Sequence, residues 1–135
     1  AAQAVGLARS ALEKSISYLN KRKKFDGPFN SFGAIRKKIA NMATNLEAAR
    51  LLVGKAAYLK DQGKKHNKES SMAKLFASKI AMDAAIDCVQ IHGSYGYIKD
   101  YGIERLMRDA KITEIYEGTS EIQELVISRE LTKCL

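Results

Sequence analysis

The sequence has no tryptophan, one proline and two cysteines among its 135 residues. Cys88 and Cys134 are too few for a disulfide framework or a cysteine-rich metal site, and a reducing compartment is the simplest inference. Because Cys88 lies in an alanine-rich run, we expect it to be a small buried core residue. The scarcity of proline, with many Ala, Leu, Ile, Lys and Glu residues, favours helix over strand.

Long apolar runs and metal-ligand spacings are also missing. No run approaches the ~18 apolar residues of a membrane span, and no signal-peptide pattern is present. The chain starts directly in an alanine-rich segment, so we expect it to be part of a longer protein. His66 and His92 lack the Glu-x-x-His partners of a di-iron bundle, and no nucleophile elbow supports a Ser-His-Asp site. We predict no metal site and no membrane span.

Charge is unbalanced toward the basic side. Lys and Arg total 23 against 15 Asp and Glu, a net charge of +8, and the excess is concentrated in residues 21–24, 36–38 and 64–65. Such runs are either solvated helix faces or a surface for an anionic partner, such as a phosphorylated cofactor. No RNP or zinc-finger pattern accompanies them, so we expect no nucleic-acid partner.

Apolar residues recur every three or four positions through most of the chain, which is the spacing of amphipathic helices. The segments with this spacing, or with helical composition, are residues 1–24, 31–61, 69–92, 102–112 and 119–133. The third is apolar around most of its circumference, so we expect it to be central. Asp26-Gly27-Pro28 predicts a turn, Ser31 a helix N-cap, and no segment predicts a strand. The expected fold is all-α: an antiparallel four-helix bundle with a short additional helix.

Residues 116–121, YEGTSE, lie between two predicted helices. Glu117 precedes a glycine, which lets the backbone approach a ligand, and it stands just before a helix N-terminus, which attracts anions. Thr119 or Ser120 can cap that helix, and Ser120 with Gln123 has the spacing of a capping box. From spacing alone, a plain interhelical loop with an N-cap is the favoured interpretation of the segment.

Two further segments have a structural and a functional interpretation. Residues 90–97, QIHGSYGY, either cap the third helix or offer backbone amides to a ligand, and we expect His92 to be structural. At the end of the first helix, the basic residues 22–24 either interact with the negative end of the helix dipole, or Arg22 and Phe25, three apart, clamp a phosphate and stack on a ring.

Read in order, these segments resemble the C-terminal helical domain of the acyl-CoA dehydrogenase family, especially its short- and medium-chain, butyryl-CoA dehydrogenase-like members. The matching stretches are RKKF at 22–25, QIHGSYG at 90–96 and RDAKITEIYEGTSEIQ at 108–123. The last stretch is highly specific, and the likeness covers the whole chain. The resemblance implies a four-helix bundle with a short fifth helix, in a homo-oligomer, a tetramer built as a dimer of dimers.

The resemblance also implies an activity and a cofactor. Family members oxidise an acyl-CoA thioester to the trans-2-enoyl-CoA: a glutamate removes a C2 proton while a hydride leaves C3 for FAD, and electron-transfer flavoprotein then takes the electrons. Glu117 matches the catalytic base, although some relatives carry the base on another helix. The matching cofactor positions are Arg22, Phe25, Gln90, Ile91, Gly93, Ser94, Thr119 and Glu121. The matching acyl-CoA positions are Tyr116, Gly118 and Arg129.

Three positions depart from the family's pattern. Asp26 follows Phe25 where glycine is more common, Gly33 replaces a glutamine that reaches FAD, and Ser94 replaces a second glycine. The family's N-terminal helical domain and middle β-domain have no counterpart in residues 1–135, so we expect this domain alone to be inactive. The resemblance implies a bacterial cytoplasm or mitochondrial matrix. A non-catalytic assembly module of the same family is the alternative.

Overall fold

The computed structural model describes residues 1–24, 27–28 and 33–132. Three long helices, α1 (Ala2–Lys21), α2 (Gly33–Asp61) and α3 (Asn67–His92), run alternately up and down. They are followed by α4 (Ser94–Tyr97), the 3-10 turn η2 (Lys99–Tyr101), α5 (Glu104–Thr113) and α6 (Ser120–Thr132). The all-α bundle expected from the sequence is confirmed.

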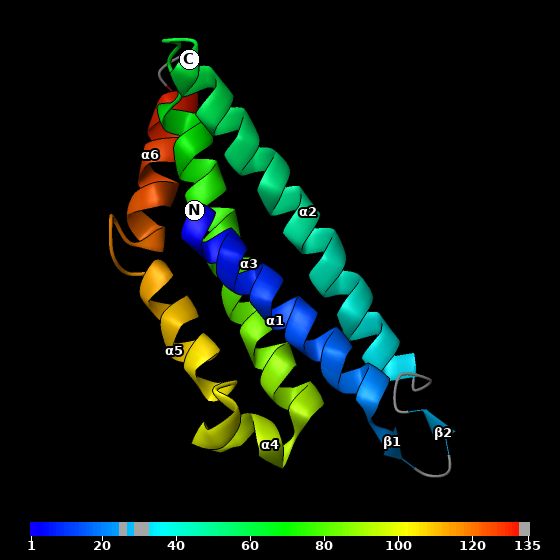
Figure 1. Cartoon of the computed structure of the whole chain (residues 1–135). Helices are drawn as coiled ribbons and strands as arrows, with labels where there is room; N and C mark the ends of the chain where they lie inside the picture. Colours follow the sequence, from blue (N-terminus) through cyan, green and yellow to red (C-terminus); the bar gives the residue numbers. More distant parts are fainter. Residues whose placement is uncertain (25–26, 29–32, 133–135) are drawn as a thin grey trace.

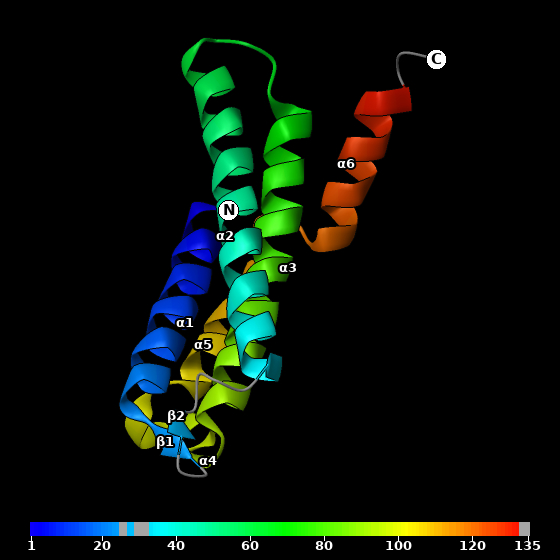
Figure 2. The same ribbon diagram turned by 90° about the vertical axis from the view of Figure 1, so that its right-hand side faces the viewer.

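Helix α3 is the centre of the bundle, as its apolar circumference predicts, because α1, α2, α5 and α6 all pack against it. Helices α5 and α6 follow one another along the same side of the molecule and together form its fourth helical layer (Figure 1). Seen from the side, α6 stands apart from α1 and touches the bundle through α3 (Figure 2). The break in this fourth layer, residues 114–119, contains Glu117.

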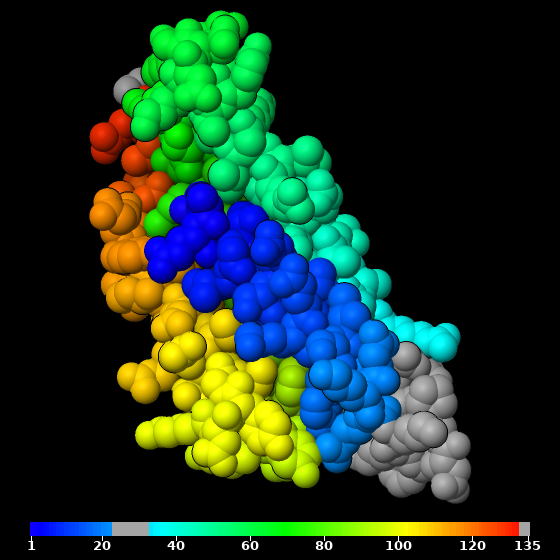
Figure 3. All heavy atoms as spheres, in the orientation of Figure 1, coloured from blue at the N-terminus to red at the C-terminus, as the bar shows by residue number. Residues whose placement is uncertain are grey.

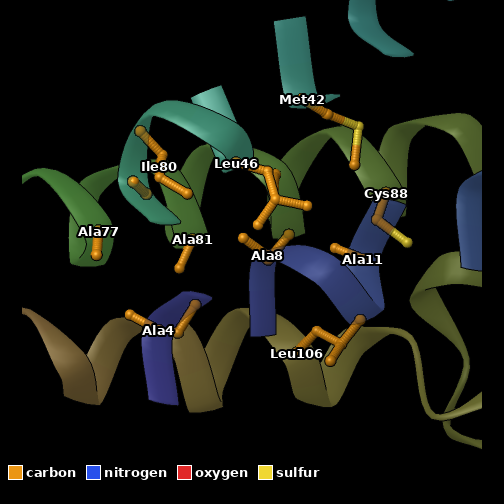
Figure 4. Packing of buried hydrophobic residues seen from close by; sticks show 14 of the residues in the cluster. Ala4, Ala8, Ala11, Met42, Leu46, Ala77, Ile80, Ala81, Cys88 and Leu106 are labelled. Atoms are coloured by element: carbon orange, nitrogen blue, oxygen red, sulfur yellow. The ribbon is translucent and has the colours of Figure 1, made fainter. Parts of the chain in front are cut away.

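The core between α1 and α3 is made of alanine. Ala4, Ala8 and Ala11 on α1 are at most 1% exposed, and Figure 4 shows them facing the alanine side of α3, where Ala77 and Ala81 are fully buried. Small side chains let the two helix backbones approach closely, and tight packing of this kind leaves little room for adjustment. Larger residues of the same core include Met42, Leu46, Ile80, Cys88 and Leu106, from α2, α3 and α5. The predicted burial of Cys88 is confirmed.

The end of the first helix differs from the prediction. Helix α1 ends at Lys21, three residues early, because Arg22 is extended (φ −102°, ψ 133°). Two short strands follow, β1 (Lys23–Lys24) and β2 (Gly27–Pro28), paired antiparallel. The prediction of no strand was therefore wrong for residues 23–24 and 27–28, whose pairing satisfies backbone groups that a longer helix would have used. The predicted N-cap, Ser31, lies outside the described residues.

The segment after α3 is more helical than the glycine-rich sequence predicts. Residues 94–97 and 99–101 form α4 and η2, and Gly102 is in the left-handed region (φ 61°), where it ends η2 and delays the start of α5 to Glu104. In the space-filling view α1 occupies the surface between α2 and this segment (Figure 3). None of the helices in the described residues is long and apolar enough to cross a membrane.

Candidate functional site

The loop between α5 and α6 has an unusual backbone. Glu117 has φ 54°, the only positive φ at a non-glycine position among the described residues, and Gly118 follows with φ 90°. The Ser120 N–H donates to the Glu114 carbonyl (3.1 Å), which closes the base of the loop. Two consecutive left-handed residues turn the chain sharply, and the Glu117 side chain is exposed at its tip.

Two side chains hold this loop from different helices. The Lys74 ammonium on α3 donates to the Gly118 carbonyl at 2.5 Å, and the Gln123 amide on α6 donates to the same oxygen at 3.1 Å and to the Glu117 carbonyl at 3.4 Å. The predicted capping box of Ser120 and Gln123 is therefore wrong. Helix α6 begins at Ser120, so Thr119 occupies the cap position, and the Gln123 amide turns back to the loop carbonyls.

A pocket of about 280 Å³ lies beside the loop. Its lining comes from α1, α3, the end of α5 and the loop itself: Ala1, Gln3, Ala4, Lys74, Ser78, Thr113, Tyr116 and Glu117. The Tyr116 hydroxyl donates to the Gln3 side-chain carbonyl, which ties the loop to α1. Burial lowers the pKa of Lys74. The structure thus places Tyr116 and Glu117 at one pocket that Lys74 also lines, and Gly118 follows Glu117 in the loop.

Glu121 and Thr119 lie at the start of α6 near this loop. A hydrogen bond from the Thr119 side chain, followed by Glu121's own backbone N–H, lowers the pKa of the exposed Glu121 carboxyl. Arg129 is in the last turn of α6 with its side chain exposed, away from the residues that line the pocket.

At the other end of α1, Arg22 lies between aromatic rings. Its guanidinium is 5.4 Å from the Tyr18 ring centroid and 5.2 Å from that of Tyr95, both within cation–π range. Tyr18 stacks on His92 with centroids 4.2 Å apart and donates its hydroxyl to the His92 carbonyl (3.3 Å). Burial raises the pKa of Tyr18, and the nearby Arg22 opposes the shift.

His92 is structural in this arrangement. It is 6% exposed, its Nδ1 lies 2.7 Å from the Cys88 carbonyl, and burial lowers its pKa, which favours the neutral ring with Nδ1–H as donor. Gly93 has φ 60° and donates its N–H to the Val89 carbonyl (3.0 Å), so it caps α3 as predicted. Gly96 lies so close to α3 that a Cβ there would be 2.6 Å from the Val89 carbonyl oxygen.

The remaining predicted cofactor positions are divided. Gln90, Gly93 and Ser94 are exposed at the end of α3, whereas the Ile91 side chain is only 2% exposed and lies in the core. Ile91 therefore offers a ligand almost no surface in this domain. Phe25 lies outside the described residues. Gly33 is exposed at the start of α2, with no heavy atom within 4 Å of where a Cβ would be. No cluster of three His, Cys, Asp or Glu side chains suited to a metal ion occurs in the part of the chain that the structure describes.

A comparison with protein families decides the assignment. Residues 1–132 match the family model described as the acyl-CoA dehydrogenase C-terminal domain. The chain belongs to this family.

Known acyl-CoA dehydrogenases and their relatives share both sequence and fold with the chain. It is 53% identical over 133 residues to 3-(aryl)acrylate reductase of Clostridium sporogenes, covering 98% of this chain and 35% of that protein. It is 49% identical over 133 residues to the mitochondrial short-chain specific acyl-CoA dehydrogenase of Bos taurus, covering 98% and 32%. Butyryl-CoA dehydrogenase of Megasphaera elsdenii superposes with a TM-score of 0.94 at 44% identity, covering 96% and 34%. The chain thus spans about a third of the length of these acyl-CoA dehydrogenase relatives.

Sequence reasoning missed three residues at these sites of the acyl-CoA dehydrogenase domain. Tyr18 stands four before Arg22 on one helix face, a spacing that could have indicated the contact. Tyr95 and Lys74 reach their partners across 73 and 44 residues of sequence, so no local spacing connects them.

Proposed function

We propose that residues 1–135 form the C-terminal domain of an FAD-dependent acyl-CoA dehydrogenase, in which Glu117 removes the C2 proton of an acyl-CoA and the product is the trans-2-enoyl-CoA. One observation carries this proposal: Glu117 stands on a left-handed loop that two helices hold in place, beside the pocket lined by Tyr116 and Lys74. The family's N-terminal helical domain and β-domain would complete the active site.

The reaction needs a carboxylate with little water around it. A thioester α-proton is a weak acid, so the base must be desolvated and the developing enolate must meet hydrogen-bond donors. Glu117 is exposed in this domain by itself, and a bound acyl chain and flavin would supply the missing cover. The backbone N–H of Glu117 would donate to the thioester carbonyl, and Tyr116 and Gly118 would flank it. Arg129 would meet the CoA moiety.

FAD, when bound, would accept the hydride from C3. The residues at the far end of α1 fit part of such a cofactor. The Arg22 guanidinium is a fixed cation held against Tyr18 and Tyr95, as a pyrophosphate requires. Gly93 has open space where a side chain would stand, so its backbone is accessible. Arg22 and Gly93, with Gln90, Ile91, Ser94 and Phe25, would contact the FAD of a neighbouring subunit. Thr119 and Glu121 would approach the FAD of their own subunit.

One relative is named a 3-(aryl)acrylate reductase, and reduction of an acrylate saturates a double bond, which is the reverse of dehydrogenation. The same carboxylate serves both directions, because a group that removes the C2 proton returns it in reverse. We propose dehydrogenation as the physiological direction, with electron-transfer flavoprotein as electron acceptor, in a bacterial cytoplasm or a mitochondrial matrix.

Exposed apolar side chains along α5, the segment after it and α6 support an assembly role for the same domain. Those at least 43% exposed are Ile112, Ile115, Ile122, Leu125 and Leu131. Large exposed apolar surfaces mark places that meet other domains or subunits. We propose that they contact the missing domains or sister subunits of a homo-oligomer. Sedimentation of the full-length protein would test this, and a strictly monomeric species at high concentration would contradict the homo-oligomer.

Glu117→Gln in the full-length protein tests the catalytic assignment. The amide preserves shape but accepts no proton, so the rate of flavin reduction by acyl-CoA should fall by about 10²- to 10⁴-fold, with FAD and acyl-CoA affinity nearly unchanged. The matched control is Glu124→Gln, an exposed carboxylate on α6, which should leave the rate unchanged. Flavin bleaching at a near wild-type rate in the Glu117→Gln protein, mixed anaerobically with substrate, would show that Glu117 is not the base.

A further inference from the structure

The left-handed conformation of Glu117 needs a source of support. A non-glycine residue at positive φ is intrinsically unfavourable and persists where surrounding contacts overdetermine it. Among the described residues, the exposed Glu117 side chain takes part in no hydrogen bond or ion pair. The support must therefore come from groups that bind the neighbouring backbone.

Those groups converge on one carbonyl. The Gly118 oxygen accepts from the Lys74 ammonium at 2.5 Å and from the Gln123 amide at 3.1 Å. These donors come from α3 and α6, so the oxygen is fixed from two directions.

Of the two donors, Lys74 has the larger influence. A charged donor forms a hydrogen bond roughly twice as strong as a neutral one. Lys74 is half-buried, and burial lowers its pKa, so its ammonium has left water to make this contact. Helix α3 is the central element of the bundle. The bond from Lys74 therefore fixes the loop relative to the core, and not only relative to its neighbours in sequence.

We propose that Lys74 is a positioning residue for the Glu117 base: its bond to the Gly118 carbonyl, supported by Gln123, holds Glu117 in the left-handed conformation that aims the carboxylate at the substrate. This inference rests on the proposed function, since it assigns Lys74 a role only if Glu117 removes the proton. Lys74 itself transfers no proton.

The test compares three substitutions in the full-length, FAD-loaded protein. Lys74→Met removes the donor and keeps the side chain's length. Lys74→Arg restores a charged donor. Lys79→Met removes an exposed lysine five residues along the same helix and serves as the matched control. Three quantities are measured for each: the limiting rate of flavin reduction, the dissociation constant of acyl-CoA, and the rate of exchange of the substrate C2 proton into D2O with the flavin already reduced.

Lys74→Met should lower the rates of flavin reduction and of C2 exchange together by about 10- to 100-fold, since a displacement near 1 Å costs on that order. The acyl-CoA dissociation constant should change less than about 3-fold, because the substrate's binding contacts are retained. Lys74→Arg should recover most of both rates, and Lys79→Met should match the wild type. A purely structural lysine would not lower the two rates selectively at constant affinity.

Unchanged rates in Lys74→Met, alongside the large loss in Glu117→Gln, would overturn the positioning role and leave the proposed function intact. A normal rate in Glu117→Gln would overturn the proposed function first. If Lys74→Met fails to fold, Lys74→Gln keeps a neutral donor and should give a smaller selective loss of both rates; a loss confined to affinity or thermal stability would count against the proposal.

Discussion

The two ends of α1 fix their functional groups by different means. At its start, the Glu117 loop is held by polar bonds from Lys74 and Gln123 to one carbonyl, and by Tyr116 bonding Gln3. At its far end, Arg22 lies against the faces of Tyr18 and Tyr95. Hydrogen bonds have direction and restrict the backbone, whereas contacts to ring faces are tolerant of small rotations.

This difference agrees with the proposed roles. A base must present its carboxylate to one C–H bond, so its backbone is bound tightly and its side chain is left without a partner. A cation for a phosphate needs a position, but its N–H groups must remain available. Aromatic faces hold the flat side of the guanidinium and leave the N–H edge to a ligand. The following substitutions in the full-length protein separate the two mechanisms.

The largest effect should come from Gly96→Ala at the aromatic end. The added Cβ would meet the Val89 carbonyl oxygen at 2.6 Å and the Val89 Cα at 2.9 Å, backbone atoms that cannot move aside. We expect a loss of about 1–3 kcal/mol in stability, measured by chemical denaturation, and weaker FAD binding. Gly54→Ala, on an exposed helix face with no atom within 4 Å, should be neutral or stabilising. Equal stability of the two variants would contradict the close approach of α4 to α3.

At the polar end, Gly118→Ala should act on rate instead. Alanine at φ 90° is strained, and its Cβ would meet the Gln123 amide. Because the loop is near the surface, it can relieve strain by changing shape, which would displace Glu117 and lower flavin reduction by about 10-fold. Stopped-flow absorbance of the flavin would measure it. If Gly118→Ala lost stability but kept its rate, the loop geometry would not matter to the base.

Acidification should destabilise the aromatic end through His92. Burial lowers its pKa in the folded protein, so the unfolded chain binds the extra proton as pH falls below ~6.5. Stability from the neutral ring is fully present above that pH and is lost on acidification, by at most about 1.4 kcal/mol per pH unit. Melting temperatures between pH 5 and 8 should fall less steeply on the acid side for His92→Gln than for the wild type. Parallel curves would exclude His92 as the source.

The smallest effect should come from Tyr18→Leu, which removes one ring face from Arg22 and the stack on His92. A cation–π contact at a partly exposed site contributes about 0.5–1 kcal/mol, so FAD should bind roughly 2- to 5-fold more weakly, measured by flavin fluorescence. Tyr18→Phe keeps the ring and loses the hydroxyl, which bonds the His92 carbonyl at 3.3 Å and also the Arg22 side chain, so it should lie closer to the wild type than Tyr18→Leu. Identical losses in both would assign the effect to the hydroxyl.

The helices were predictable because their apolar residues repeat with the helical period, and the central place of α3 followed from the alanines on its other faces. The Glu117 loop could be located from Gly118 and the cap residues that follow. The left-handed backbone of this loop could not be predicted, because it depends on Lys74, which is 44 residues away from Gly118 in the sequence. For Gln123 the local spacing led to a wrong prediction. Its distance of three residues from Ser120 predicted a capping box, but the side chain binds the carbonyls of Glu117 and Gly118 instead. The β1–β2 pairing was not predicted because strands of two residues have no periodic sequence pattern.

The alanine seam between α1 and α3 has a consequence for how this domain can change over generations. With Ala4, Ala8, Ala11, Ala77 and Ala81 almost fully enclosed, any larger residue must push the helices apart, and glycine would weaken them. The alanine contact therefore fixes the distance between α1 and α3. Twenty residues at 1.5 Å each make α1 about 30 Å long, and that length separates the acid from the cation. Mutations elsewhere can change the groups at either end of α1, but the placement of α1 on α3 is set by alanine side chains.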